Sequence, residues 1–183
     1  MSEISDRYRR LAAEFTDTVA GVPPDRWAAQ TPCDEWDVRG LVGHVADSQG
    51  LFLGLVGSSL ADDRPTVADD PLAAWTAARD AMQAALDDPD VAATEFDGLM
   101  GRSRLDAAAD RFLAFDLVVH RWDLAHATGQ DETIAAPDLA RLREGIAGLG
   151  AALHSPGVCG PAIEVPDTAS EQIKVLAELG RQA

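Results

Sequence analysis

An aspartate and a histidine four residues apart are the pair in this chain best placed to do chemistry together. Asp116 and His120 stand in a segment that is otherwise rich in apolar side chains. Residues four apart on a helix lie one turn above each other on the same face, so the carboxylate and the imidazole would point to one place. Neither group is buried without cost unless it has a partner. A divalent cation bound inside a helical bundle is the most specific explanation of this pair.

A second histidine, His44, lies midway along another amphipathic segment. Helical bundles build metal sites from side chains on facing helices, so we predict that His44, Asp116 and His120 bind one divalent cation. Two imidazoles and one carboxylate, with a position left for water, suit Zn2+ in an open site, and Ni2+ and Fe2+ accept the same set. The alternative is that the three are ordinary polar core residues without a metal. His126, six residues past His120 and on another helix face, and His154 are predicted to lie at the surface.

Other polar and aromatic residues near these positions have two interpretations each. Asp123, three residues after His120, either orients that imidazole or a neighbouring segment, or is exposed to solvent. Cys33 lies near the start of a predicted helix, where a thiol can become nucleophilic, although a buried structural cysteine is the simpler interpretation. Trp36 and Trp122 are predicted to pack in the core rather than to line a substrate cleft. The chain contains none of the common nucleotide-binding or serine-hydrolase motifs.

Composition and charge exclude several classes of partner. The chain has 183 residues, of which 46% are hydrophobic and 25% charged, as expected for one globular domain spanning 1–183. It carries 31 acidic and 15 basic side chains, a formal net charge of -16. Nucleic acids and anionic membranes are bound mainly through Lys and Arg, so we expect neither as a partner. A small-molecule substrate or thiol is the expected partner, and a homodimer is compatible with the apolar helix faces.

Cysteine usage and the N-terminal residues are typical of a cytoplasmic protein. The two cysteines, Cys33 and Cys159, lie far apart and form no CxxC motif or disulfide framework. The first residues lack the apolar core of a signal peptide, and no apolar run is long enough to span a bilayer. We therefore expect a cytoplasmic location.

Hydrophobic periodicity predicts a protein built almost entirely from helices. Apolar residues recur at helical spacing, and the segments so predicted are 4–20, 38–56, 71–86, 105–128, 137–153 and 170–179. Residues 90–104 form either a brief hairpin or a loop. The fold class is therefore all-α, built around a four-helix bundle with additional short C-terminal helices.

Residues at the predicted helix ends support these boundaries. Asp37 can cap the second helix, and Asp69 or Asp70 the third, which has a proline in its first turn. Gly129 is a good C-terminal residue for the helix that carries Asp116 and His120. Thr168 is predicted to cap the last helix.

Two segments of the chain also resemble a known family. Thr31–Val45 follows the pattern T-P-C-x-x-W-x-V-R-x-L-x-x-H-V, and it resembles the opening signature of actinobacterial DinB-like proteins of the mycothiol-dependent maleylpyruvate isomerase N-terminal type. Asp116–Ala125, followed by Thr128 and Gly129, is similar to the second signature of that family. Gly157–Pro161 and Leu179–Arg181 look like the tail of its short members.

The resemblance implies a DinB-like four-helix bundle that binds a divalent metal, often zinc or nickel, through three side chains. By position, these are His44 in the first signature and Asp116 with His120 in the second. The isomerase proper has glutamate where this chain has Asp116, and it continues into a second domain that contributes to its active site. The resemblance therefore implies the metal-binding bundle rather than maleylpyruvate isomerisation itself.

Three functions follow from these residues and stay open on the sequence alone. The first is a metal-dependent transferase or isomerase that uses a low-molecular-weight thiol, of the mycothiol or bacillithiol type, on a small electrophilic substrate. The second is a non-catalytic metal-binding module, such as a stress or sensor protein. The third is a metal-free helical scaffold, in which His44, Asp116 and His120 are polar core residues.

Overall fold

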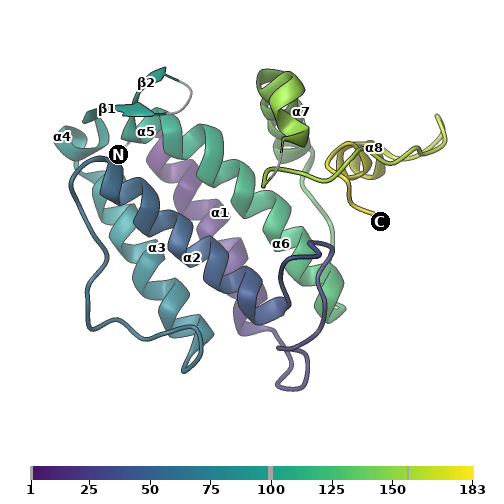
Figure 1. The fold of residues 1–183 in the computed structure, drawn as a ribbon, viewed down its shortest axis with the longest axis horizontal. Coiled ribbons are helices and arrows are strands. Elements are labelled where there is room, and N and C mark those ends of the chain that lie inside the picture. Colours follow the sequence, from purple (N-terminus) through teal and green to yellow (C-terminus); the bar gives the residue numbers. More distant parts are fainter. Residues whose placement is uncertain (1, 99–100, 156) are drawn as a thin grey trace. The chain divides into compact units, whose positions relative to one another are not determined.

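The computed structural model describes residues 2–98, 101–155 and 157–183. The described residues are mostly helical and include one small two-stranded sheet (Figure 1). It divides into two compact units, Met1–Asp131 and Glu132–Ala183. The all-α fold class predicted above is confirmed. A single domain over 1–183 stays a prediction.

Four long helices form the first unit. They are α1 (Glu3–Ala20), α2 (Val38–Leu55), α3 (Pro71–Asp87) and α6 (Ala114–Thr128). Helices α1 and α2 each pack against both α3 and α6, which is the arrangement of a four-helix bundle (Figure 1). The predicted second and fourth helices therefore lie side by side, and these carry the candidate ligands.

The core of the bundle is filled by aromatic and aliphatic side chains from all four helices. Phe15 and Trp75 meet edge to face with ring centroids 4.9 Å apart, and both side chains are fully buried. Burying an aromatic side chain of this size contributes about 1.5–3 kcal/mol to stability. The buried Tyr8 hydroxyl donates to Gln49 Oε1 over 2.9 Å, so the polar end of this core residue is satisfied. The bundle thus has a rigid interior that can hold side chains in place.

The predicted helix ends are confirmed at three positions. Asp37 caps α2 by accepting from the Gly40 N–H at 2.7 Å. Asp70, and not its neighbour, caps α3 by accepting from the Ala73 N–H at 3.0 Å, with a proline in the first turn. Gly129 ends α6 with φ of 73°, a left-handed conformation that costs glycine little.

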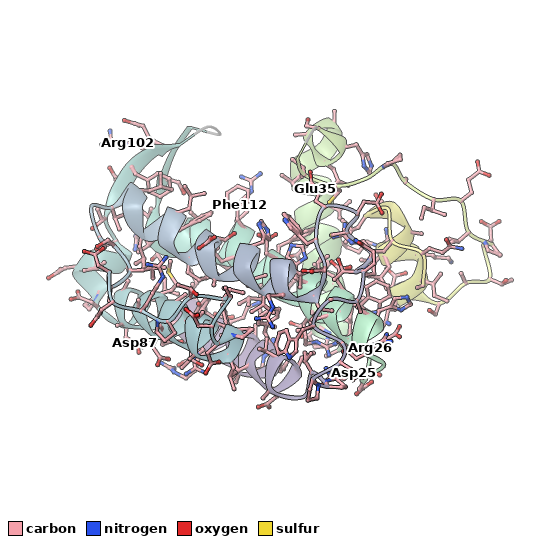
Figure 2. All side chains as sticks on the ribbon, turned by 60° about the horizontal axis from the view of Figure 1, so that its bottom comes forward. Asp25, Arg26, Glu35, Asp87, Arg102 and Phe112 are labelled. Carbon is pink, nitrogen blue, oxygen red and sulfur yellow. The ribbon has the colours of Figure 1, made fainter. Side chains whose placement is uncertain are left out.

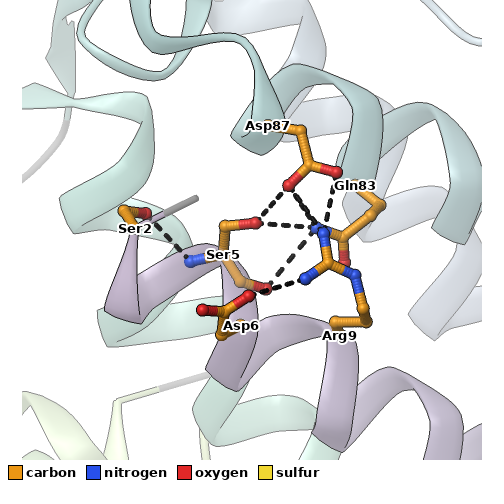
Figure 3. A network of polar contacts seen from close by, with 6 residues as sticks. All are labelled: Ser2, Ser5, Asp6, Arg9, Gln83 and Asp87. Carbon is orange, nitrogen blue, oxygen red and sulfur yellow. Dashed lines mark hydrogen bonds and ion pairs between the residues drawn. The ribbon is translucent and has the colours of Figure 1, made fainter.

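A polar network joins the start of α1 to the end of α3 (Figure 3). The Asp87 carboxylate accepts from the Ser5 hydroxyl and from Gln83 at 3.0 Å. Both of its oxygens also accept from the Arg9 guanidinium at 2.8 Å. These bonds lower the pKa of Asp87, the Ser5 hydroxyl contributing most. The network fixes these two helix ends to each other.

The fourth predicted helix contains a wider turn. It runs from α5 (Leu105–Ala108) through a π-helical turn (Ala109–Leu113) into α6. Buried residues recur here every four positions, at Leu105, Ala109, Leu113 and Leu117. A regular α-helix has 3.6 residues per turn and would rotate such residues off the core, whereas the wide turn accommodates the extra spacing. The turn thereby sets the orientation of α6, which follows it.

The described part of residues 90–104 contains two paired strands, as expected for the hairpin rather than for the loop. The short helix α4 (Pro89–Ala92) precedes β1 (Glu95–Gly98), which pairs antiparallel with β2 (Gly101–Arg104). The residues between the strands, 99–100, lie outside the described part of the chain. The two strands share four residue pairs, too few for a stable sheet without the adjoining helices.

The second unit contains α7 (Ala136–Leu149), a 3₁₀ turn (Gly150–His154) and α8 (Glu171–Glu178). The fifth predicted helix thus ends earlier as an α-helix, because Gly150 adopts φ of 52°. No described helix is long and apolar enough to cross a bilayer.

The predicted cap of the last helix is wrong by two residues. Ser170, not Thr168, caps α8, and its hydroxyl accepts from the Ile173 N–H at 3.3 Å. A capping side chain must reach the N–H of the second or third helical residue. Thr168 stands too far before Glu171 to do so.

Candidate metal centre

The structure brings together the three residues predicted as ligands. His44 comes from the middle of α2, and Asp116 and His120 stand one turn apart on α6. One ligand atom of each residue lies within 4.8 Å of the other two. His120 is buried, and the other two side chains are half-buried. The three donors converge as expected, while their role as metal ligands stays a prediction.

Their spacing requires only a small adjustment to fit one cation. Nitrogen and oxygen ligands of a four-coordinate zinc ion stand about 3.3 Å apart, given bonds of about 2.0 Å. The donors lie within 4.8 Å of one another, so each pair must close by at most ~1.5 Å. The His44 and His120 rings are nearly perpendicular at 85°, with centroids 5.2 Å apart, so they do not stack against each other.

Trp36 forms a wall of this site. It lies in the loop before α2, which Glu35 marks in Figure 2, and its ring stacks on His44 with centroids 4.0 Å apart. It meets His120 in an edge-to-face arrangement, with ring centroids 5.9 Å apart. We expected Trp36 to be core packing, but it is half-buried and contacts both imidazoles. The indole therefore shields the two rings from solvent.

The environment of His44 keeps its imidazole neutral. Burial, followed by the neighbouring His120, lowers the pKa of His44 from 6.5 to about 4. Burial disfavours a charged ring, and a second imidazole nearby disfavours it further. Only a neutral imidazole has a lone pair for a metal, so at neutral pH His44 is in the form that binds one.

Asp123 holds His120 in place. Its carboxylate is fully buried, and Oδ2 lies 3.0 Å from His120 Nδ1. A proton on Nδ1 donated to this carboxylate leaves the lone pair on Nε2, the nitrogen then available to a cation. Of the two interpretations of Asp123 from the sequence, the structure shows the orienting one. The three-residue spacing between His120 and Asp123 on one helix was the sequence feature that indicated this contact.

Cys33 also lies at this site, where the sequence alone did not place it. Its Sγ donates to Asp123 Oδ2 over 3.5 Å, and the side chain is half-buried. Cys33 lies in a loop, so no helical periodicity relates it to Asp123 or His120. The thiol, the carboxylate and the imidazole form a continuous chain of contacts from the loop to α6.

A comparison of the sequence with family models identifies the family of this chain. Residues 8–125 match the model described as the mycothiol maleylpyruvate isomerase N-terminal domain. The match covers well over half of the chain and includes all three candidate ligands. The chain belongs to this family.

Two relatives come from Mycobacterium tuberculosis, one from strain H37Rv and one from strain CDC 1551. Both are described as uncharacterized proteins, and each is 28% identical over 155 residues, which cover 82% of this chain and 81% of the relative. No solved structure matches the chain. The relatives therefore add no activity to the comparison.

The mycothiol maleylpyruvate isomerase N-terminal family is DinB-like and metal-binding. The residues of this chain fit a metal by their own chemistry, because two neutral-capable imidazoles and a carboxylate converge and one ring is oriented by a buried carboxylate. The metal binding of the family and the three converging donors therefore both support a candidate metal site.

The remaining two histidines do not join the group. His126 is exposed on α6 and stacks on Trp122, with ring centroids 4.9 Å apart. Trp122 is fully buried, as predicted for a packing residue. His154, in the second unit, is exposed, and its Nδ1 lies 2.6 Å from the Gly160 carbonyl oxygen. Both histidines occupy the surface positions expected for them.

Proposed function

We propose that this family member binds one divalent cation through His44, Asp116 and His120 and uses it in a thiol-dependent transfer or isomerisation on a small electrophilic substrate. The observation that carries the proposal is the convergence of these three donors from α2 and α6. The family, whose model is named for a mycothiol-dependent isomerase, supports the thiol as co-substrate.

Zn2+ is the cation we propose, with Ni2+ and Fe2+ as the chemically acceptable alternatives. Zinc accepts imidazole and carboxylate ligands without a geometric preference of its own, and catalytic zinc sites use three protein ligands. Asp116 is one methylene shorter than glutamate, so its carboxylate oxygens lie closer to α6 than those of the longer residue would.

A bound cation would act as a Lewis acid that lowers the pKa of a thiol, so that a nucleophilic thiolate forms near neutral pH. The residues of the chain prepare this chemistry. Asp123 orients His120, and burial keeps His44 neutral. Trp36 covers the imidazoles on one side, which limits access of water. The half-buried Asp116 leaves the group reachable from solvent.

Elemental analysis of protein purified without a histidine tag tests the first half of the proposal. We expect about one equivalent of a divalent metal. His44→Ala and His120→Ala should lose it, because each removes a ligand. His126→Ala is the matched control and should retain it, since His126 is exposed on the same helix as His120. Metal-free wild-type protein that takes up no cation on titration would reject the proposal.

A thiol titration tests the second half. Mycothiol or bacillithiol added to the metal-loaded protein should raise its unfolding temperature and change the spectrum of a Co2+ or Ni2+ derivative. The same addition to the His44→Ala variant should do neither. Metal binding without any response to either thiol would instead favour a non-catalytic metal-binding module.

A further inference from the structure

The imidazole of His120 belongs to a second group of potential ligands. Cys33, His120 and Asp123 also offer one ligand atom each within 4.8 Å of one another. Asp123 contacts the ring at Nδ1, and Cys33 contacts the same carboxylate oxygen of Asp123. It contains a thiol, which the first group lacks.

The spacing of these atoms is close to that of ligands around a single ion. With bonds of about 2.3 Å to sulfur and about 2.1 Å to oxygen or nitrogen, a tetrahedral zinc site holds sulfur and oxygen ~3.6 Å apart, and nitrogen and oxygen ~3.4 Å apart. Here Cys33 Sγ lies 3.5 Å from Asp123 Oδ2, and His120 Nδ1 lies 3.0 Å from the same oxygen. The third pair, Cys33 Sγ and the His120 ring nitrogen, lies within 4.8 Å. A cation would therefore require the second distance to open by a few tenths of an ångström and the third to close by at most ~1.2 Å.

Charge and burial favour a cation among these atoms. Asp123 is fully buried, and His120 is 6% exposed. A buried carboxylate requires compensation by hydrogen bonds or by a positive charge. The Cys33 thiol and the His120 ring contact it now, and a cation among the three would supply a positive charge instead. Cation binding releases the thiol proton of Cys33, and a divalent ion then balances one thiolate and one carboxylate.

The loop holds Cys33 in position before any ion binds. The Cys33 N–H donates to the Thr31 hydroxyl oxygen at 3.2 Å. Its carbonyl oxygen accepts from Gln30 Nε2 at 3.0 Å and from the Trp36 N–H at 3.1 Å. A ligand held in advance loses less conformational freedom on binding, so its affinity for the ion is higher.

We propose that Cys33, Asp123 and His120 form a second cation site that is selective for soft, thiolate-preferring ions such as Cd2+. This second site competes with the first site for His120. Soft cations prefer thiolate ligands, whereas Ni2+ is satisfied by imidazole and carboxylate. A neutral imidazole has one lone pair, so an ion on Nδ1 moves the ring proton to Nε2. His120 then no longer serves the group with His44 and Asp116. Occupation of the second site by a soft ion thus disables the first.

The test is a titration of the full-length, metal-free protein with Cd2+ in a non-thiol reductant. The thiolate-to-cadmium charge-transfer band in the ultraviolet reports a Cd–S bond directly and requires no enzymatic activity. We expect a band that saturates near one equivalent. Cys33→Ser should abolish it, because serine keeps the size of the side chain and removes the sulfur.

Three further variants separate this site from its alternatives. Cys159→Ser removes the other cysteine and should leave the band unchanged. His44→Ala removes a ligand of the first site only, so the Cd2+ midpoint should shift by less than about threefold. Asp123→Asn should weaken Cd2+ binding by more than the about 10-fold that the loss of a merely supporting partner costs, because it replaces a charged ligand of this site by a neutral amide. Circular dichroism checks that each variant is folded.

The proposal is overturned if the wild type shows no band, if the band survives Cys33→Ser, or if His44→Ala abolishes it. Ni2+ binding to the Cys33→Ser variant separates this result from the proposed function. That binding should equal the wild type, because it depends on His44, Asp116 and His120. A missing Cd–S band with intact Ni2+ binding rejects the second site alone, whereas lost Ni2+ binding in the wild type rejects the first.

Discussion

Asp123 should control the affinity of the first metal site although it is not one of the three predicted ligands. Its buried carboxylate lies 3.0 Å from His120 Nδ1 and determines which ring nitrogen is free. Asp123→Asn keeps an oxygen that can accept from Nδ1–H but removes the negative charge. Asp123→Leu removes both the charge and the acceptor. The two variants therefore separate electrostatic support of the ring from its orientation.

The expected losses follow from the kind of contact. Replacing a supporting partner of a metal-bound histidine reduces metal affinity about 10- to 100-fold, or about 1.4–2.8 kcal/mol at 1.4 kcal/mol per tenfold. We expect Asp123→Asn near the lower end, because the hydrogen bond survives. Asp123→Leu should lie near the upper end, because the ring loses the carboxylate that contacts Nδ1 and can rotate.

Calorimetric titration of the metal-free protein with Ni2+ measures these affinities. Ni2+ is chosen because it does not favour the thiolate of Cys33. Asp47→Asn is the matched control, since Asp47 stands three residues after His44, as Asp123 does after His120, but is exposed on α2. It should change the affinity by less than about twofold. Wild-type affinity in Asp123→Leu, or an equal loss in Asp47→Asn, would refute the role assigned to Asp123.

Three further predictions concern pH and stability. In the metal-free protein, His44 should titrate near the pKa of about 4 in an NMR experiment. Because this pKa lies below the ordinary 6.5, His44 of the unfolded chain takes up a proton at a higher pH than His44 of the folded protein. The free energy of unfolding should therefore fall as the pH drops from 6.5 towards 4, and it should fall less steeply in His44→Gln. An NMR midpoint near 6.5 would contradict this. Trp36→Ala should raise the pKa of His44 towards 6.5, since it removes the ring stacked on the imidazole; an unchanged midpoint would show that the indole does not cause its burial. Asp87→Asn should lower the free energy of unfolding by at most about 1 kcal/mol at neutral pH, as for exposed ion pairs. Since the pKa of Asp87 is lowered from 3.8, this difference in free energy should disappear as the pH falls below 3.8 and the wild-type carboxylate is protonated. Denaturant unfolding at several pH values measures the difference. A difference that persists in acid would contradict the network of Figure 3.

Local sequence determined the helices and the pairing of two site residues. Hydrophobic periodicity and the caps Asp37 and Gly129 predicted the main helices to within a few residues, because helical backbone geometry depends on neighbouring residues. The four-residue spacing of Asp116 and His120 likewise placed both on one face of α6.

Only the tertiary structure decided what meets this face. His44 reaches it because α2 packs against α6, and the wide turn before α6 sets the direction in which Asp116 and His120 point. The contacts of Trp36 with His44 and of Cys33 with Asp123 join a loop to helices that are distant in the sequence. Periodicity describes one element at a time, whereas the relative position of two elements depends on how their side chains interlock. Spacing along the chain therefore grouped Asp116 with His120. Packing brought the predicted His44 to them, and Trp36 and Cys33 as well.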